Sequence, residues 1–445
     1  MKPNLLRLPC ARTLCVAMSS PVWLAFLGGA ASAAEEARRS PYEVFDQLAR
    51  VLTLVEREYV EPVDRSRLVT GAIKGMVSEL DPHSTYLPKS DYSIFRGDTQ
   101  GRFGGVGVEV DFGRDQVTVI APIEGSPAAR AGVRPGDRIT AIDDVPVAGK
   151  SSQELVRTMR GAPGSVVTLT VRRGDGNQLV TFKLTREIIE VASVAVKMLL
   201  GEVAYVRVKA FQAGSHEELV DGIAELKRRS GRELAGLVLD LRNNPGGLVD
   251  EAVAVANEFL TGGVIYTTRH RGVVIDEVTA TVHGAFRTGP VVVLVNEYSA
   301  SAAELVAGAL QDQRRATVVG GRTFGKGSVQ SIIDLPWGDG LRLTTMRYYT
   351  PGGKAIQARG IAPDVLVDAA YIPDRSFAVI RESDLEHHLE GEEGDDALEP
   401  ERPDAETLGT HLGVSRDVPR NPVGGNDLAL SIGYQIVTGV LGSAE

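Results

Sequence analysis

The chain has 445 residues, of which 43% are hydrophobic and 24% are charged. These proportions are typical of an ordinary globular protein, and the length predicts about two to four domains. The formal net charge of −10 argues against a nucleic-acid partner and against a basic patch that would bind anionic lipid.

Residues 1–33 have the features of a secretory signal peptide. A basic start is followed by the mostly apolar residues 15–29, and residues 31–33 are Ala-Ser-Ala, a small-x-small cleavage site. The apolar stretch is short for a membrane span, and an uncleaved signal anchor is the alternative. The only two cysteines, Cys10 and Cys15, lie in this segment, so a mature chain would have no cysteine nucleophile and no disulfide. We therefore expect an exported protein of the bacterial periplasm.

Residues 34–95 are predicted to form a helical region. Apolar side chains recur at helical spacing over residues 42–59 and again over residues 64–80. The second helix ends at the turn Leu-Asp-Pro-His-Ser, which contains His83. His83 could serve as a general base, but its place at a helix end favours a simple turn residue.

Residues 96–187 form a predicted β-rich module. Short alternating strands are separated by glycine turns, and residues 152–160 have the spacing of an amphipathic helix. The module begins with the glycine-rich run Gly104-Gly105-Val106-Gly107-Val108. This run lacks the Gly-Lys-Ser/Thr ending of a phosphate-binding loop, which argues against nucleotide binding.

Residues 188–370 alternate strands with helices, which predicts an α/β core. The apolar strand 236–240 leads to a turn that contains Gly246 and Gly247. Open α/β sheets bind their ligands at such strand ends. A second apolar strand, residues 291–295, leads into a Ser/Ala-rich turn and a helix, so the same edge of the sheet is predicted to carry both turns.

Ser301 is predicted to lie on the first turn of that helix. Backbone N–H groups there have no partner within the helix and the dipole favours negative charge, which suits a nucleophile whose product is an oxyanion. A serine nucleophile needs a base, and Lys326 would be one if burial lowered its pKa by about 3 units. On this chemistry alone, a helix-capping serine and a surface lysine are the favoured interpretation, and Lys354 is another candidate base.

Two phrases of the sequence carry a resemblance to a known family. Residues 296–304 are Asn-Glu-Tyr-Ser-Ala-Ser-Ala-Ala-Glu, and residues 321–330 are Gly-Arg-Thr-Phe-Gly-Lys-Gly-Ser-Val-Gln. Together they resemble the signature of the C-terminal processing peptidases, also called tail-specific proteases, which are Ser/Lys-dyad enzymes with a PDZ domain. One position departs from the pattern, because Ala303 stands where many members have serine.

The resemblance implies a role for each matching residue. Ser301 would be the nucleophile, Lys326, 25 residues later, the base, and Gln330 the residue that supports the lysine. Ser299 is the rival nucleophile. The phrase Asp-Leu-Arg-Asn-Asn-Pro-Gly-Gly resembles the family's oxyanion loop, so the N–H groups of Gly247 and Ala302 would form the oxyanion hole.

The β-rich module resembles a PDZ domain of the bacterial protease type. The resemblance is strongest from Ser-Pro-Ala, at residue 126, to Gly-Asp-Arg-Ile, which ends at residue 139. It implies that the N–H groups of the run Gly104–Val108 capture a peptide C-terminus and that the peptide adds a strand beside it. Side chains of Val106, Val108 and the helix 152–160 would shape an apolar pocket. Arg160 would act as a gate that senses substrate, or would be a solvated helix end.

The resemblance also implies a fold. We expect an α/β catalytic core with layers like those of crotonase or ClpP, an inserted β-rich PDZ domain and an N-terminal helical segment. The remaining tail, residues 371–445, is predicted to be acidic and flexible, because residues 390–406 are rich in acids and poor in apolar residues. Residues 426–441 regain helical spacing and predict a helix that docks on the body or mediates dimerisation.

The favoured interpretation is an exported Ser/Lys endopeptidase that recognises proteins through their C-terminal tails. It needs no cofactor and no metal. Its expected partners are proteins or peptides with apolar C-terminal tails, and an adaptor or activator protein and a homo-oligomer are left open.

Three other interpretations are weighed against it. A histidine base, such as His83, His270 or His283, would give an ordinary triad. A PDZ adaptor with an inactive peptidase-like fold is a second, although the intact candidate catalytic residues argue against it. A crotonase-like hydratase is a third, but it would need neither a signal peptide nor a PDZ domain.

Overall fold

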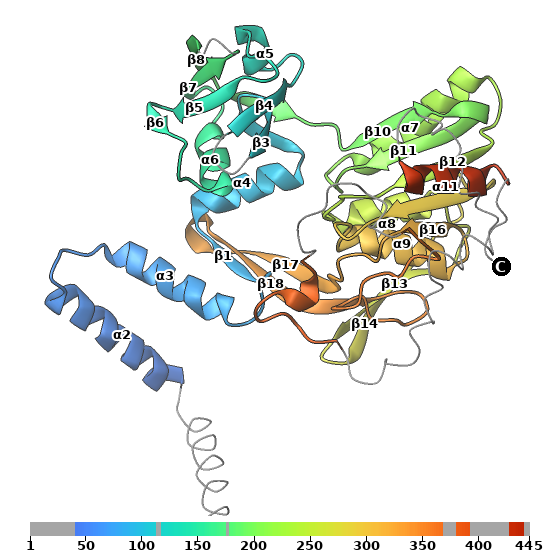
Figure 1. Ribbon diagram of the computed structural model, residues 1–445. Helices are drawn as coiled ribbons and strands as arrows, with labels where there is room; N and C mark the ends of the chain where they lie inside the picture. Colours follow the sequence, from blue (N-terminus) through green and yellow to red (C-terminus); the bar gives the residue numbers. More distant parts are fainter. Residues whose placement is uncertain (1–40, 113–116, 175–177, 368–379, 392–426, 440–445) are drawn as a thin grey trace, which may run out of the picture. The chain divides into compact units, whose positions relative to one another are not determined.

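The computed structural model describes residues 41–112, 117–174, 178–367, 380–391 and 427–439 (Figure 1). The predicted signal peptide lies outside these residues. The chain divides into two compact units, residues 1–73 and residues 74–445. No helix in the described ranges is both long enough and apolar enough to cross a bilayer.

Two helices occupy the predicted N-terminal helical region. They are α2 (Pro41–Glu58) and α3 (Arg65–Ser78), which confirms both helices predicted there. A third helix, α4 (Lys89–Thr99), and the short strand β1 (Thr85–Leu87) follow, and neither was predicted.

The peptidase-like core is built on a six-stranded sheet. Its order is β10-β11-β12-β15-β16-β19, and every neighbouring pair is parallel except β10 with β11. The strands are β10 (Val194–Met198), β11 (Val203–Val208), β12 (Gly236–Asp240), β15 (Val291–Val295), β16 (Thr317–Gly320) and β19 (Val365–Leu366). The predicted α/β core is therefore confirmed.

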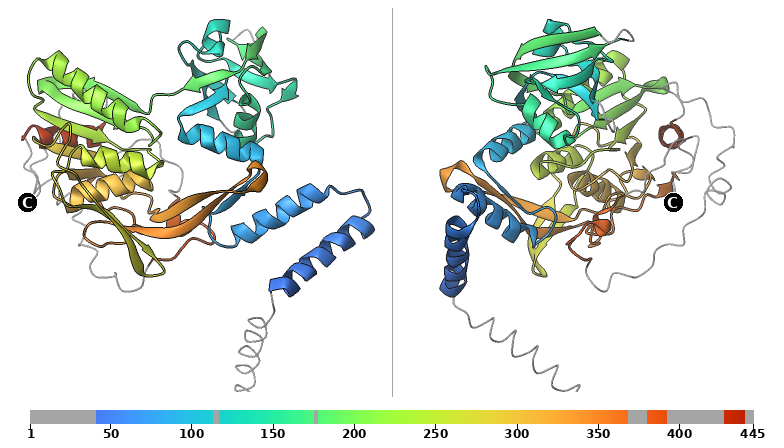
Figure 2. Two further views of the ribbon diagram at one scale, coloured as in Figure 1. Left: turned by 180° about the vertical axis from the view of Figure 1, so that it is seen from behind. Right: turned by 60° about the vertical axis from the view of Figure 1, so that its left-hand side comes forward.

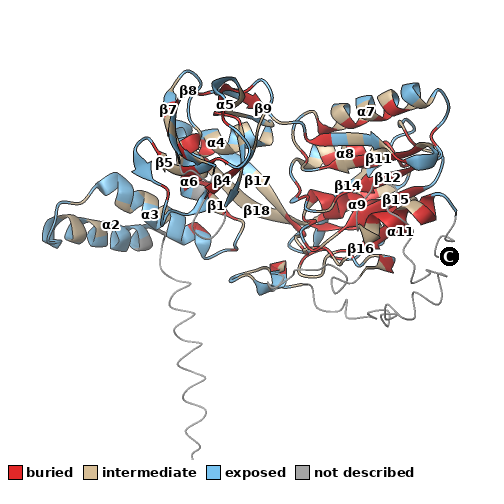
Figure 3. Cartoon of the chain, turned by 45° about the horizontal axis from the view of Figure 1, so that its top comes forward, coloured by how far each residue is buried: buried red, intermediate tan, exposed pale blue. Residues whose placement is uncertain are grey.

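Helices cover both faces of this sheet, as a mostly parallel sheet requires. Leu237 and Leu239 pack into the cluster formed with α7 (Ser215–Ser230), α8 (Val249–Asn257) and α9 (Ala302–Asp312). Val238, between them, packs into the opposite cluster with α11 (Leu428–Val437). Figure 2 shows α11 on the other side of the sheet from α8 and α9, and Figure 3 shows that α9 and the central strands are buried.

The chain that follows the candidate lysine enters a second sheet. Its order is β1-β18-β13-β14, with β17 also paired to β18. Its longer strands are β13 (Val264–His270), β14 (Val273–Thr279), β17 (Ser328–Asp334) and β18 (Gly340–Tyr349). The turn between β17 and β18 confirms the hairpin predicted at residues 334–340. Lys326 therefore lies two residues before β17.

The β-rich module has a separate sheet and a separate core. The sheet order is β3-β4-β5-β7-β8, with β6 on β5, so β3 is an edge strand. The elements are β3 (Val108–Phe112), β4 (Val117–Pro122), α5 (Pro127–Ala131), β5 (Arg138–Ile142), β6 (Val145–Pro146), α6 (Ser152–Met159), β7 (Val166–Arg173) and β8 (Gln178–Thr185). Strands β2 (Arg102–Gly105) and β9 (Glu187–Glu190) pair where the chain enters and leaves the module.

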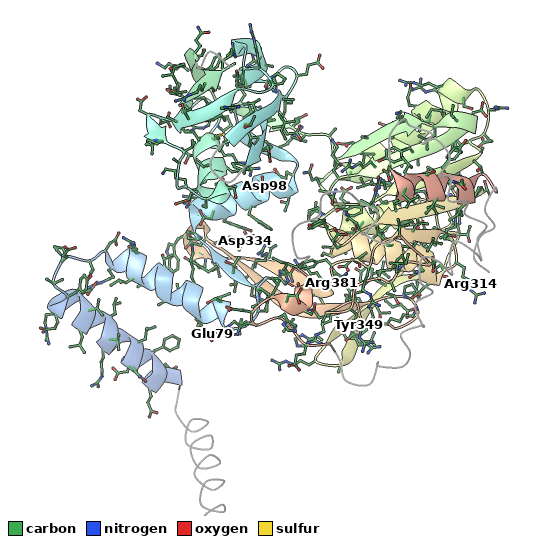
Figure 4. The ribbon with its side chains drawn as sticks, viewed as in Figure 1. Glu79, Asp98, Arg314, Asp334, Tyr349 and Arg381 are labelled. Carbon is green, nitrogen blue, oxygen red and sulfur yellow. The ribbon has the colours of Figure 1, made fainter. Side chains whose placement is uncertain are left out.

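Two stretches of the predicted acidic tail pack against the core. Glu382 is fully buried, and its neighbour Arg381, labelled in Figure 4, donates a 3.0 Å hydrogen bond to the carbonyl of Thr323. The predicted helix near the end of the chain is α11, and it docks on the sheet. The prediction of a flexible tail therefore does not hold for residues 380–391, while residues 392–426 lie outside the described residues.

Candidate active site

Ser301 has a backbone conformation that serine rarely adopts. It follows β15 and caps α9, with φ 54° and ψ −117°. Such a conformation costs on the order of 1–3 kcal/mol and persists only where the surrounding structure enforces it. Here the turn is held by a 2.9 Å hydrogen bond from Ala300 N to Asn244 O and by a 2.7 Å bond from Ser301 N to Glu304 Oε2. This strained turn at a strand-to-helix junction is suited to presenting a nucleophile.

Ser299, the rival nucleophile, has a structural role. Its side chain is fully buried, its Oγ donates a 2.8 Å hydrogen bond to Leu241 O, and it accepts a 3.0 Å bond from Asn296 N. Ser301 is partly exposed instead. The geometry therefore favours Ser301 as the nucleophile.

The glycine turn after β12 lies against Ser301. A Cβ built on Gly246 would lie 2.8 Å from Ser301 Cβ and 3.0 Å from Ala302 N, and a Cβ on Gly247 would lie 2.1 Å from Phe211 O. Both glycines also have positive φ, 101° and 137°, which favours glycine. Among the described residues, neither Gly247 N–H nor Ala302 N–H has a protein acceptor. Both predicted donors are therefore unpaired among the described residues, and their role as an oxyanion hole stays a prediction.

Glu304 connects the nucleophile turn to the lysine loop. Its carboxylate is fully buried, and Oε2 accepts hydrogen bonds from Ser301 N (2.7 Å) and from Lys326 N (2.9 Å). The other oxygen, Oε1, accepts from Thr323 Oγ1 (2.5 Å) and from Gly325 N (2.7 Å). Because one oxygen binds both backbone N–H groups, Ser301 and Lys326 must lie in one site.

Burial and hydrogen bonding have opposite effects on the pKa of Glu304. Burial raises the pKa of this carboxyl to about 7, although the four hydrogen bonds favour the charged form. The sequence analysis did not assign Glu304 a role. Its spacing, Ser-x-x-Glu at a helix start, is the signal of a capping box and could have identified it.

Lys326 has the electrostatic environment that a lysine base requires. Burial is the main cause that lowers the pKa of its ammonium to about 8, and Arg342 lowers it further, whereas Glu382 and two other carboxylates oppose the shift. The alternative base, Lys354, forms a 3.2 Å ion pair with Asp312 and is largely exposed. Burial therefore gives Lys326 a reason to be partly neutral near physiological pH.

Gln330 lies on β17, but its amide is engaged by its own strand and by β18. Nε2 donates to Ser328 Oγ (2.9 Å) and to Thr344 Oγ1 (3.2 Å). No hydrogen bond in the described part of the chain joins Gln330 to Lys326, or Lys326 Nζ to Ser301 Oγ. The supporting role of Gln330 therefore stays a prediction.

Two of the three candidate histidines are engaged by other groups, and the third is exposed. His83 Nε2 pairs with the buried Glu382 at 2.7 Å. His270 Nδ1 lies 2.7 Å from a backbone carbonyl on β18, and His283 is exposed. Within the described ranges, none of the three forms a hydrogen bond with Ser301.

The predicted peptide-binding run is divided between a strand and the module core. Gly104 and Gly105 lie in β2 and pair with β9. Val106 is buried in the same cluster as Leu155 and Met159 of α6, and Val108 packs against it, so Val106 belongs to the core rather than to an open pocket. Gly107 has φ 74°, and a Cβ there would lie 2.2 Å from the side chain of Ser126. The free edge of β3 is available for an added peptide strand.

Arg160, the predicted gate, contacts the segment before the module. It caps the C-terminal end of α6, forms an ion pair with Asp98 of α4 and stacks 4.3 Å over the ring of Phe103 (Asp98 is labelled in Figure 4). These contacts lie on α4 and β2 rather than on the α/β core, so gating by Arg160 stays a prediction.

Comparisons with known proteins agree with this organisation. Residues 202–367 match the model of peptidase family S41, residues 118–173 match a PDZ domain, and residues 28–91 match the N-terminal domain of the activating protease CtpB. A carboxy-terminal-processing protease of Bartonella bacilliformis is 38% identical over 403 residues, which are 89% of this chain and 89% of that protein. The chain belongs to peptidase family S41.

Two other proteases are also similar to this chain. A probable CtpA-like serine protease of Staphylococcus aureus is 39% identical over 327 residues, which cover 73% of this chain and 64% of that protein. Among solved structures, the photosystem II D1 C-terminal processing protease has 32% identity and a TM-score of 0.47, over 71% of this chain and 86% of that one. This member of family S41 is thus a C-terminal processing serine peptidase with a PDZ domain, as the two sequence phrases predicted.

Proposed function

We propose that this chain is an exported endopeptidase in which Lys326 activates Ser301, and that its PDZ domain selects proteins by apolar C-terminal tails. One observation supports the pairing of Ser301 with Lys326 as a catalytic dyad. The buried Glu304 Oε2 binds the backbone N–H groups of both residues, while burial lowers the pKa of Lys326 to about 8. The expectation of export rests on residues 1–33.

The lowered pKa of Lys326 greatly increases the fraction of this lysine that is neutral and can accept a proton. With a pKa of about 8, about a quarter of Lys326 is neutral at pH 7.5, against about one in a thousand for an ordinary lysine. Neutral Nζ takes the proton from Ser301 Oγ as that oxygen attacks the scissile carbonyl, which is general-base catalysis.

The remaining steps use the proposed oxyanion donors and the same lysine. The N–H groups of Gly247 and Ala302 stabilise the oxyanion of the tetrahedral intermediate. Protonated Lys326 gives its proton to the leaving amine, and the carbon–nitrogen bond breaks to leave an ester on Ser301. Water then attacks the ester with Lys326 again as base, which releases the new carboxyl end and restores the hydroxyl.

The substrate preference follows from the free edge of β3. A peptide that adds a strand there would place alternate side chains beside α6, where the apolar Val156 is only partly buried, whereas Leu155 and Met159 belong to the module core. An apolar C-terminal tail would bury its side chains there, whereas a charged tail would lose hydration without a partner.

Cleavage of a reporter protein tests this proposal. An unfolded reporter with an apolar tail should be cut at least about tenfold faster than the same reporter with an acidic tail, since one lost apolar contact is worth about 1–3 kcal/mol. Ser301→Ala should abolish both reactions, and Ser299→Ala, the matched control, should retain activity in its folded fraction. Equal rates for the two tails would contradict selection by the PDZ domain, and cleavage by Ser301→Ala would contradict the nucleophile.

A further inference from the structure

The C-terminal helix α11 packs closely on the sheet face opposite α9. Its buried side chains share a core with β12, β15 and β16. The approach is close because glycine lies on both sides: a Cβ on Gly236 of β12 would meet Val437 at 2.2 Å, and a Cβ on Gly433 would meet Leu294 at 3.1 Å. This helix begins 60 residues after the segment that matches family S41, yet it is part of the catalytic core.

At the start of this helix, Asp427 and Arg242 form an ion pair with two hydrogen bonds. Asp427 caps α11 by accepting a 3.0 Å hydrogen bond from Leu430 N. Its two carboxylate oxygens also accept from the two terminal nitrogens of Arg242, each at 2.8 Å. The same guanidinium donates to Asp240 at 2.9 and 2.6 Å. Arg242 therefore joins the end of β12 to the start of α11.

Hydrogen bonds and mutual attraction keep the groups of this cluster charged despite their burial. Burial would lower the pKa of Arg242, but its hydrogen bonds to Asp240 and Asp427 raise it above the ordinary value. Burial would likewise raise the pKa of Asp427, but the bonds from Arg242 keep it below the usual range. Tyr205 OH donates a further 2.7 Å bond to Asp240. Bidentate arginine–carboxylate pairs restrict geometry as well as adding energy.

Arg242 is also the first side chain of the turn that carries the predicted oxyanion donor. The next residue, Asn243, has φ 58° and exchanges two hydrogen bonds with Asn296, at 2.9 and 2.8 Å. Asn244 O then accepts from Ala300 N at 2.9 Å. These bonds connect the residues that follow Arg242 to the nucleophile turn, and Gly246 N, next to Gly247, donates a 2.8 Å bond to Asn244 Oδ1.

We propose that Asp427 is a positioning residue for catalysis, which clamps Arg242 and so fixes the oxyanion turn from the rear face of the sheet. This inference rests on the proposed function, because it assumes that Gly247 N–H binds the oxyanion. Displacement of that donor weakens stabilisation of the transition state but leaves binding of the substrate tail unchanged. The helix α11, which begins after Asp427, then helps to set the geometry of the active site.

The test uses the full-length protein and the variant Asp427→Asn. Asparagine still caps the helix but loses the charge and the second acceptor oxygen. We expect kcat to fall about tenfold with KM unchanged, a partial loss compared with about 100-fold for a missing donor. Inhibition by a peptide boronate, whose tetrahedral adduct occupies the oxyanion hole, should weaken by the same factor. Amide hydrogen exchange of residues 241–248 should quicken.

A matched control lies on the same helix. Tyr434→Phe removes a 3.2 Å hydrogen bond from α11 to Leu200 O, away from the oxyanion turn, and should leave kcat and the exchange of residues 241–248 unchanged. Unchanged exchange and kcat in Asp427→Asn would overturn the proposal, as would a lower melting temperature with unchanged kcat per titrated site. A wild type that neither cleaves nor binds the boronate would refute the proposed function instead, and the exchange data would still decide whether Asp427 holds the turn.

Discussion

Replacement of Lys326 with methionine should abolish peptide hydrolysis and at the same time stabilise the fold. Activity should be lost because Lys326 is the base for Ser301 in the proposed mechanism. Stability rises because the folded protein disfavours the ammonium: its pKa is lowered from 10.5 to about 8, and each unit corresponds to about 1.4 kcal/mol. At pH 7 the lysine is protonated in both folded and unfolded states, so the full penalty of about 3 kcal/mol is present there.

The pH dependence of this gain in stability distinguishes removal of the buried ammonium from better packing of the methionine. As pH rises from 8 toward 10.5, the folded protein already holds the neutral amine, so the penalty shrinks and the advantage of Lys326→Met should shrink with it. Urea unfolding at pH 7 and at pH 10 measures both values. The control is Lys354→Met, which removes an exposed ion pair and should change stability by less than about 1 kcal/mol. Residual hydrolysis by Lys326→Met, or a less stable variant at pH 7, would contradict this expectation.

Replacement of Glu304 with alanine should damage both activity and stability. Its carboxylate is the acceptor for four donors, and each buried donor left unpaired costs about 1–3 kcal/mol. We expect a loss of about 3 kcal/mol or more in the free energy of unfolding. We also expect kcat to fall at least about 100-fold, because misplacement of reacting groups by about 1 Å has an effect of that size.

The control for Glu304 is another buried glutamate. Glu258 pairs with His216 at 2.6 Å and lies outside the hydrogen-bond network of Ser301 and Lys326. Glu258→Ala should lower stability but retain kcat per titrated active site. Urea unfolding with active-site titration measures the two quantities separately. Normal kcat in the folded fraction of Glu304→Ala would show that the carboxylate does not position the dyad.

The sequence was sufficient to predict the features that depend on local patterns. The apolar runs at residues 236–240 and 291–295 predicted β12 and β15 to the residue, because fully buried parallel strands are continuous apolar segments. The nucleophile turn followed from the strand-to-helix transition together with the family resemblance. By contrast, α4 has no strong apolar periodicity and was missed.

Features that depend on distant residues were not available from the sequence. The hydrogen bond between Arg242 and Asp427 joins residues 185 positions apart. The sequence around either residue gives no indication of its partner. The same limit applies to Glu382, which belongs to an acidic stretch but is buried against His83. Arg160 and Gln330 were identified by position, but their hydrogen-bond partners, Asp98 and Thr344, are set by tertiary structure.

The central claim is that a lysine is the base, and the pH dependence of Ser301 acylation tests it most directly. The rate of acylation by an activated peptide ester should rise with pH and reach half its maximum near pH 8, since neutral Lys326 is required and its pKa is about 8. The rate should be unchanged in His83→Ala, His270→Ala and His283→Ala, corrected for folded protein. A midpoint near 6.5, the ordinary pKa of histidine, that disappears in one of these variants would contradict the dyad.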